Sequence, residues 1–305
     1  VGSVSHYSSF PLSDLTLQGY LFLLLSALCS LGIGVIFKVA AVRSIDSSYL
    51  IGTNYVVAAI AGLIVASRDL ETAATDPTLL LVASATGILF IAGFYAMAYA
   101  TRVAGVALTL SSWRMSVLLP FMASWLIWAE VPSSYQLIGL GLAGVAFLLI
   151  ANVFSGVGGQ DRKSVAALLL VFGIGGTVDT ILKLIDESLQ IDSDSILVTC
   201  LIFGTAAVSM MILLSIRKLK GTEALFVPAV VPGAILGMLN LGTIVFLLAA
   251  LKVLPGTVVF PAINVTIVVG ASLLGTLIWD EQLSRSTRLG VLIAVAALVL
   301  LTVGS

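Results

Sequence analysis

Residues 19–42 read GYLFLLLSALCSLGIGVIFKVAAV, a continuous apolar run in which Lys38 is the one charged side chain. About 20 mostly apolar residues in a row allow one α-helix to cross the hydrocarbon core of a bilayer. Further runs of this kind follow at roughly 47–67, 78–101, 105–129, 134–154, 164–185, 194–216, 228–251, 255–279 and 287–303. Because each run is continuously apolar and does not alternate as a barrel strand does, the sequence predicts an all-α membrane protein of about ten transmembrane helices.

The composition excludes most classes of soluble protein. Hydrophobic residues make up 60% of the 305 residues and charged residues only 10%, whereas a soluble domain carries about 25% charge. The mean hydropathy is +1.19. The net charge of −1 argues against a nucleic-acid partner. We therefore expect a multi-pass protein of the cell membrane, surrounded by the lipid bilayer.

The sequence offers little that could bind a metal or a cofactor. Cys29 and Cys200 both lie in apolar runs, where thiols serve as small packing residues. Residues 1–18 form a polar N-terminal leader without the basic and apolar regions of a signal peptide. Gly173-x-Gly175-Gly176 lacks the preceding strand of a dinucleotide-binding loop, and the chain has no Walker motif. We expect no cofactor and no metal.

The second half of the sequence repeats the first. A shift of 151 residues places residues 126–128 (Leu-Ile-Trp) on 277–279, Glu130 on Glu281 and Gly139 on Gly290. The repeat predicts two units of five helices, residues 19–154 and residues 164–303. Since five is an odd number, the second unit is inserted upside down relative to the first. Inverted repeats of this kind are common in secondary transporters.

This doubled pattern, in which each fourth run ends in Leu-Ile-Trp-x-Glu and each fifth opens near a glycine, resembles the drug/metabolite transporter superfamily. Within it, the chain is similar to the EamA-type carriers from about Gln18 onward. The resemblance implies a ten-helix inverted-repeat fold with a central cavity between the halves. It also implies transport of a small solute, such as an amino acid, a nucleotide sugar, a sugar phosphate or an amine, often coupled to protons or to a counter-substrate.

Basic residues are distributed unevenly between the connections. The connections after the odd-numbered runs hold nine of them, namely Arg43, Arg102, Arg162, Lys163, Arg217, Lys218, Lys220, Arg285 and Arg288. The opposite side holds only Arg68 and Lys252. Basic connections mark the cytoplasmic side, so the count indicates that both termini lie outside. The family resemblance implies that both termini lie inside, and the orientation stays open at this point.

Ionisable side chains inside a spanning helix are costly and tend to face a partner or an aqueous path. Four occur here: Lys38, Arg114, Asp179 and Lys183. Arg114 lies near the middle of the fourth run, where a guanidinium can clamp a carboxylate or pair structurally with a carbonyl or with Asp179. Asp179 and Lys183 share a helix face and form either a local ion pair or a gate opened by a proton or by substrate. Lys38 matches Lys183 under a shift of 145 residues, and each either lines the cavity or reaches the interface.

Uncharged polar residues complete the predicted substrate-binding site. The candidates are Trp113, Tyr95, Tyr99, Asn264 and Asn240. Trp113 precedes Arg114 and matches Asn264 in the repeat. Tyr95 and Tyr99 share a face of the third run because they are four residues apart. For each candidate, an interhelical hydrogen bond or core packing is the alternative to substrate binding.

Several residues predict how the helices bend and pack. Three prolines fall inside runs, namely Pro120, Pro232 and Pro261. Each predicts a kink, which is either a hinge or a static bend. Gly139-x-x-x-Ala143 and Gly290-x-x-x-Ala294 form small-residue faces, so we expect the fifth and tenth runs to pack together or to form a homodimer contact. Glu130 and Glu281 end their runs, where they cap the interface or bind a proton.

The favoured hypothesis is a secondary carrier of a small anionic or zwitterionic metabolite, such as an amino acid or an organic acid, that works by alternating access. It rests on the charges inside the runs, of which three are positive and one is negative. A proton-coupled exporter of cationic or aromatic compounds, using Asp179, is the first alternative. A membrane enzyme or lipid-handling protein is the second. Because the polar connections are too short to build a catalytic centre, we expect no enzyme.

Overall fold

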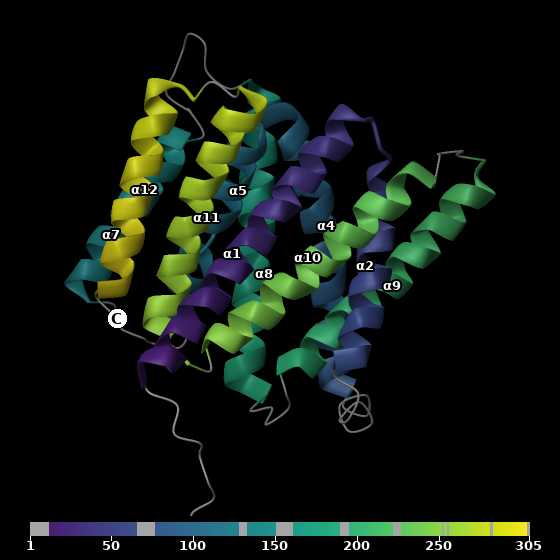
Figure 1. The fold of residues 1–305 in the computed structure, drawn as a ribbon, viewed down its shortest axis with the longest axis horizontal. Coiled ribbons are helices and arrows are strands. Elements are labelled where there is room, and N and C mark those ends of the chain that lie inside the picture. The colour runs from purple at the N-terminus through teal and green to yellow at the C-terminus, as the bar shows by residue number, and fades with distance from the viewer. Residues whose placement is uncertain are drawn as a thin grey trace, which may run out of the picture.

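The computed structural model describes residues 12–65, 77–127, 133–150, 161–189, 195–221, 227–251, 253–254, 256–280 and 283–303. All regular structure in these residues is α-helical (Figure 1). The helices are α1 (Leu12–Val42), α2 (Ser47–Val65), α4 (Pro77–Ala104), α5 (Val106–Met115), α6 (Leu118–Ile127), α7 (Ser134–Ile150), α8 (Arg162–Leu189), α9 (Ser195–Leu219), α10 (Val227–Leu251), α11 (Gly256–Trp279) and α12 (Arg285–Val303).

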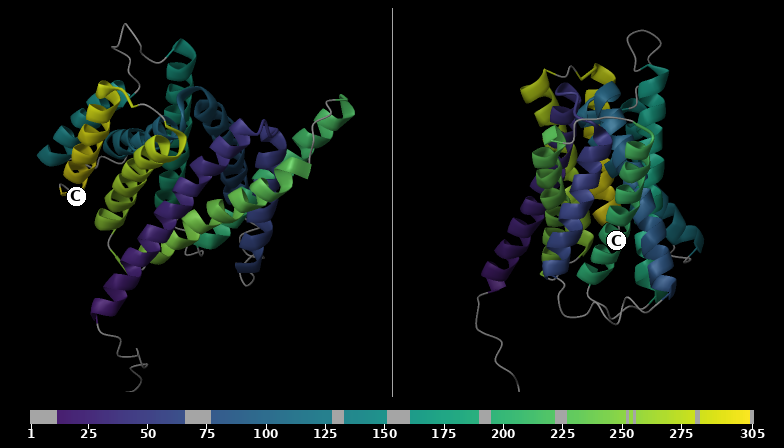
Figure 2. Two further views of the ribbon diagram at one scale, coloured as in Figure 1. Left: turned by 45° about the horizontal axis from the view of Figure 1, so that its top comes forward. Right: turned by 90° about the vertical axis from the view of Figure 1, so that its right-hand side faces the viewer.

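Each predicted run coincides with helix in the described residues. Seven helical stretches are long and apolar enough to cross a membrane, and they lie in α1, α2, α4, α5–α6, α8, α9 and α10. The prediction of an all-α protein with many transmembrane helices is confirmed at this level. The first helix begins at Leu12, inside the predicted polar leader of residues 1–18. In the right view of Figure 2 most helices run in roughly one direction, whereas the left view shows α1 and α10 crossing their neighbours at an angle.

The fourth run, predicted as one helix over 105–129, is two helices separated by a turn at Ser116 and Val117. Pro120 has no N–H with which to bond the Ser116 carbonyl in the α-helical manner. The amide of Leu119 bonds that carbonyl instead, at 2.9 Å, which tightens the turn. The other two predicted kinks are not accompanied by a break, because α10 and α11 run continuously through Pro232 and Pro261.

The main core contains buried residues from every described helix except α6, α7 and α12. Aromatic rings from four of these helices meet in it. The Tyr55 ring on α2 lies 5.5 Å from Phe94 on α4 and 6.1 Å from Phe203 on α9. Phe37 on α1 lies 5.4 Å from the same Phe94 ring. These rings fill the space where helices of the two halves of the chain cross.

A second, smaller core lies where α7 packs along α12. Ala143 and Ala146 of α7 and Ala294 and Ala297 of α12 are all fully buried in it. Small side chains let two helices approach closely and gain van der Waals contact. The prediction that the fifth and tenth runs pack together is therefore confirmed. Figures 1 and 2 show this pair at one edge of the bundle.

Most of the larger helix contacts made by the first five segments have a counterpart among those of the last five. Helix α1 packs on α10 as α8 packs on α4, and α2 packs on α10 as α9 packs on α4. Helix α1 also packs on α11, while α8 packs on α5 and α6. The remaining large contacts join α2 to α9, α5 to α11 and α7 to α12. The contacts named here are unchanged when each helix of one half is replaced by the corresponding helix of the other half.

The connections that follow the odd-numbered segments lie at one end of the bundle, where hydrogen bonds join their neighbouring residues. We call this end the basic end. The bonds run from Arg102 to Ile45, from Arg217 to Asp46, from Ser164 to Val103 and from Ser286 to Leu149. They join described residues at the helix ends that flank the connections after the first, third, fifth, seventh and ninth segments. The basic residues after these segments therefore share one end, uppermost in Figure 1, while α1 begins and α12 ends at the other.

We expect Ala143→Leu to destabilise the protein, because Ala143 is fully buried between α7 and α12. Extra methylenes in a close-packed contact cost about 1–3 kcal/mol. Val145→Leu is the matched control, since Val145 lies on the same helix and is 47% exposed. Thermal unfolding in detergent should show a lower midpoint for Ala143→Leu only. A wild-type midpoint for Ala143→Leu would mean that the two helices are not tightly packed.

Candidate functional site

Arg114, the second-last residue of α5 before the break, is the centre of a polar group inside the bundle. Its Nη2 donates to Ser30 Oγ on α1 at 2.9 Å. Its Nη1 lies 3.5 Å from Asn264 Oδ1 on α11, the outer limit for a hydrogen bond. The side chain is partly buried. Among the described residues these two bonds use two of the five N–H donors of the guanidinium.

Hydroxyl groups of α1 and α10 extend this polar group. Ser30 Oγ lies 3.5 Å from Thr243 Oγ1, and Ser26 Oγ donates to the Thr243 carbonyl at 2.7 Å. Ser26 and Ser30 lie one turn apart on α1, so both face α10. The oxygen atoms that hold Arg114 are therefore neutral hydroxyl and amide oxygens, and no carboxylate of the described residues lies within 4 Å of the guanidinium.

Trp113 points to the other side of α5, into a slot between α4 and α8. A Cβ at Gly93 of α4 would lie 3.0 Å from the Trp113 ring, and one at Gly175 of α8 would lie 3.1 Å from it. The Cβ at Gly175 would also lie 2.9 Å from Ser116 Oγ in the break. The glycine run 173–176, which the sequence excluded as a nucleotide loop, thus brings α8 against the broken segment.

Asp179 lies one turn beyond Gly175 on α8. Its carboxylate and the Arg114 guanidinium are within electrostatic range of each other. No ion pair of 4 Å or less joins them in the described part of the chain, so the predicted structural pair is not formed as a direct contact. Lys183 lies a further turn along α8, and its side chain is outside the described residues.

The other predicted site residues do not all join this group. Asn240 Nδ2 on α10 donates to Asn54 Oδ1 on α2 at 3.3 Å, which is the interhelical bond that was the alternative to substrate binding. Tyr95 interacts with the Ser48 side chain near the basic end. Tyr99 is 47% exposed. Lys38 lies on α1, two turns beyond Ser30, and is partly buried. Glu130 and Glu281 lie outside the described residues.

Sequence reasoning missed the hydroxyl residues around Arg114. Ser26, Ser30 and Thr243 sit in apolar runs, and their only signal is the four-residue spacing of the two serines. Ser111, one turn before Arg114 on α5, was also missed. Its Oγ is fully buried and has no hydrogen-bond partner within the described residues. Buried hydroxyls normally have a partner, so Ser111 adds a free polar atom beside the site.

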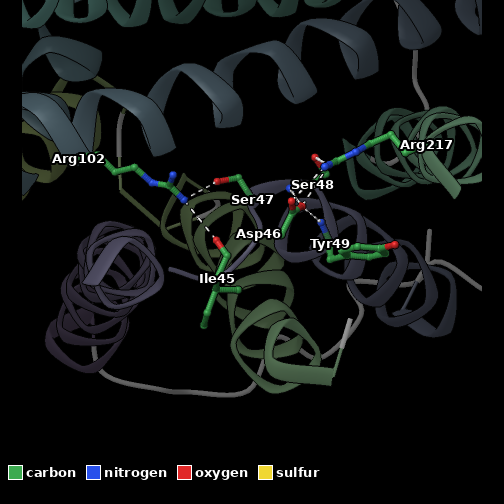
Figure 3. Close-up of polar contacts among 7 residues, drawn as sticks. All are labelled: Ile45, Asp46, Ser47, Ser48, Tyr49, Arg102 and Arg217. Atoms are coloured by element: carbon green, nitrogen blue, oxygen red, sulfur yellow. Dashed lines mark hydrogen bonds and ion pairs between the residues drawn. The ribbon is translucent and has the colours of Figure 1, made fainter. Parts of the chain in front are cut away.

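A second polar group lies at the basic end, in the turn between α1 and α2 (Figure 3). Arg217 of α9 binds both carboxylate oxygens of Asp46 and also donates to Ser48 Oγ. Partial burial by itself raises the pKa of Asp46, but hydrogen bonds from Arg217 and from the amides of Tyr49 and Ser48 outweigh it and lower the pKa below its usual value. Asp46 is therefore ionised at neutral pH, and its pairing is lost only as the pH falls through that lowered pKa.

Comparison with known proteins supports the fold and leaves the chemistry open. No protein-family model matches the chain. An uncharacterized protein of Haemophilus influenzae is 26% identical over 288 residues, which cover 90% of this chain and 95% of that protein. A crystal structure of a protein with 15% identity has a TM-score of 0.52 and covers 95% of this chain and 97% of that one. At this level of identity the likeness shows a shared fold alone.

Gly175→Val should displace the Trp113 ring and the break beside it, because its Cβ would lie 2.9 Å from Ser116 Oγ. Overpacking of this kind costs about 1–3 kcal/mol. Gly173→Val is the matched control, since a Cβ at Gly173 meets no atom within 4 Å. Thermal unfolding and tryptophan fluorescence should change for Gly175→Val and stay near wild type for Gly173→Val. Equal behaviour of the two variants would refute the slot.

Proposed function

We propose that the protein is a secondary transporter that carries a small anionic or zwitterionic metabolite, such as an amino acid or an organic acid, across the cell membrane by alternating access. The observation that carries the proposal is the Arg114 guanidinium, which is held inside an apolar bundle by neutral oxygens of Ser30 and Asn264. A positive charge is costly there. The paired oxygens of a substrate carboxylate match the geometry of the guanidinium N–H donors that have no partner among the described residues.

The broken segment beside Arg114 supports the same proposal. Transporters often bind substrates where a spanning helix is interrupted, because backbone groups freed from the helix can face the ligand. Here the turn at Ser116 and Val117 begins two residues after Arg114. Helices from both halves of the chain, α1 and α11, supply the partners of the guanidinium. A ligand bound there would contact both halves, as alternating access requires.

We further propose two inverted five-helix repeats of the drug/metabolite transporter type. The repeated Leu-Ile-Trp-x-Glu pattern and the shift of 151 residues support this architecture. So does the exchange of helix neighbours, in which α1 packs on α10 as α8 packs on α4. In this architecture the α5–α11 contact lies at the middle of the molecule, where the polar group around Arg114 is found.

The proposal includes an orientation in which the basic end faces the cytoplasm. Nine basic residues against two favour that side.

In a background with Cys29 and Cys200 replaced by alanine, we expect an impermeant maleimide to label Leu17→Cys in intact cells. Arg43→Cys, at the basic end, should react only after the cells are permeabilised. Both starting side chains are exposed in the bundle and lie at opposite ends of the candidate span Leu17–Val42. The reverse labelling pattern would contradict this orientation.

One observation favours a second candidate function. Asp179 places a carboxylate in electrostatic range of the same site, and a carboxylate can bind a proton or an organic cation. An exporter of cationic or aromatic compounds would depend on Asp179, with the Trp113 ring as a neighbouring apolar surface. Such a carrier would bind cations with Arg114 removed and would lose them with Asp179→Asn.

A thermal-shift screen of the purified protein tests the proposal. The panel holds amino acids, organic acids, sugar phosphates, nucleotide sugars and cationic drugs. A ligand at 100 times its dissociation constant stabilises the folded state by about 2.7 kcal/mol. We expect a carboxylate ligand to raise the unfolding temperature of the wild type but not of Arg114→Ala. In Arg114→Lys we expect the affinity for this ligand to be at least tenfold weaker, because lysine lacks the paired donors. Arg288→Ala, an exposed arginine of α12, is the control that keeps the shift. Shifts with cations alone would reject the proposal in favour of the exporter.

A further inference from the structure

We propose that the ion pair between Asp46 and Arg217 is a gate contact at the basic end, which holds that end closed and separates when the carrier opens there. The inference rests on the proposed carrier function and concerns residues outside the group around Arg114. Asp46 belongs to the turn between α1 and α2, in the first half of the chain. Arg217 belongs to the last turn of α9, in the second half. The pair therefore ties the two halves together at their solvent-facing edge.

The ion pair has the geometry of a strong and specific contact. Arg217 Nη1 donates to Asp46 Oδ1 at 3.2 Å and Nη2 donates to Oδ2 at 3.1 Å (Figure 3). Two parallel bonds between a guanidinium and a carboxylate fix the orientation of both groups. Arg217 also donates to Ser48 Oγ. One side chain of α9 thus engages Asp46, directly before α2, and Ser48, in the first turn of α2.

The turn that carries Asp46 is fixed to the first half independently of Arg217. Asp46 Oδ1 accepts bonds from the amides of Ser48 at 2.8 Å and Tyr49 at 3.2 Å, so the carboxylate caps α2. Arg102 Nη2 at the end of α4 donates to the Ile45 carbonyl at 3.2 Å. The same Nη2 donates to Ser47 Oγ at 3.1 Å. The carboxylate is held in place by α2 and α4, and α9 can release it without unfolding the turn.

The pair is also built to open reversibly. The side chains of Arg217 and Asp46 are 27% and 25% exposed, so water can hydrate both as they separate. A buried pair would leave two desolvated charges when broken. The tripeptide Ile45-Asp46-Ser47 at the start of α2 recurs in the sequence as Ile191-Asp192-Ser193, which lies outside the described residues.

The distance between the two sides of the contact tests the gate. Spin labels are attached at Arg43→Cys and Lys220→Cys, two exposed positions that flank the pair, with Cys29 and Cys200 replaced by alanine. The protein is reconstituted in lipid nanodiscs, and the distance distribution is measured by double electron–electron resonance. Arg217→Glu places two negative charges in contact, so we expect the ratio of the longer to the shorter distance to rise about tenfold.

Two variants separate the pair from its surroundings. Arg217→Lys keeps the charge and should keep the short distance. Lys218→Glu makes the same change of charge on the next residue of α9, which is exposed, and should also keep it. A wild-type distribution for Arg217→Glu, or an equal opening in Lys218→Glu, would overturn the gate. Because this measurement needs no substrate, its failure leaves the Arg114 assignment intact, and a failed ligand screen at Arg114 leaves the distance result unchanged.

Discussion

A guanidinium inside an apolar bundle must be surrounded by oxygen atoms, and this requirement organises the centre of the molecule. Ser30 and Asn264 supply those oxygens from α1 and α11, so both helices are held against α5 at one level. Thr243 of α10 continues the group through Ser30. Within the described part of the chain this charge has only neutral partners, which leaves N–H donors for a further anion. That property, rather than the presence of an arginine as such, connects the fold to the proposed transport of a carboxylate.

Close approach of helices makes this centre possible. Gly93 and Gly175 admit the Trp113 ring between α4 and α8, which fixes α5 on the side opposite to the partners of Arg114. At the edge of the bundle, fully buried alanines bring α7 and α12 together. In lipid, helices gain little from burying apolar surface, so contacts through small residues and interhelical hydrogen bonds carry the packing. The polar groups therefore serve both stability and the site.

The features predicted well from the sequence are those set by one segment or by the repeat. Apolar length located the helices, and small-residue spacing paired α7 with α12. The repeat pointed to Asn264 as a candidate through its match to Trp113, but its contact with Arg114 is a finding of the structure. The features that were missed depend on how helices rotate against each other. Ser30 and Thr243 look like ordinary residues of apolar runs, and Tyr95 turns to the basic end because of contacts that no local pattern records. The position of the break followed from Pro120. That the break lies inside the bundle, beside Arg114, depends on how α8 packs against it, which the sequence does not record.

The most direct test of the central claim is a counterflow measurement in proteoliposomes. Vesicles are loaded with an unlabelled carboxylate ligand and diluted into a trace of the same labelled compound. The account predicts transient accumulation of label by the wild type and by Arg288→Ala, and none by Arg114→Ala. Accumulation at the wild-type rate by Arg114→Ala, with the protein folded and inserted to the same extent, would contradict it.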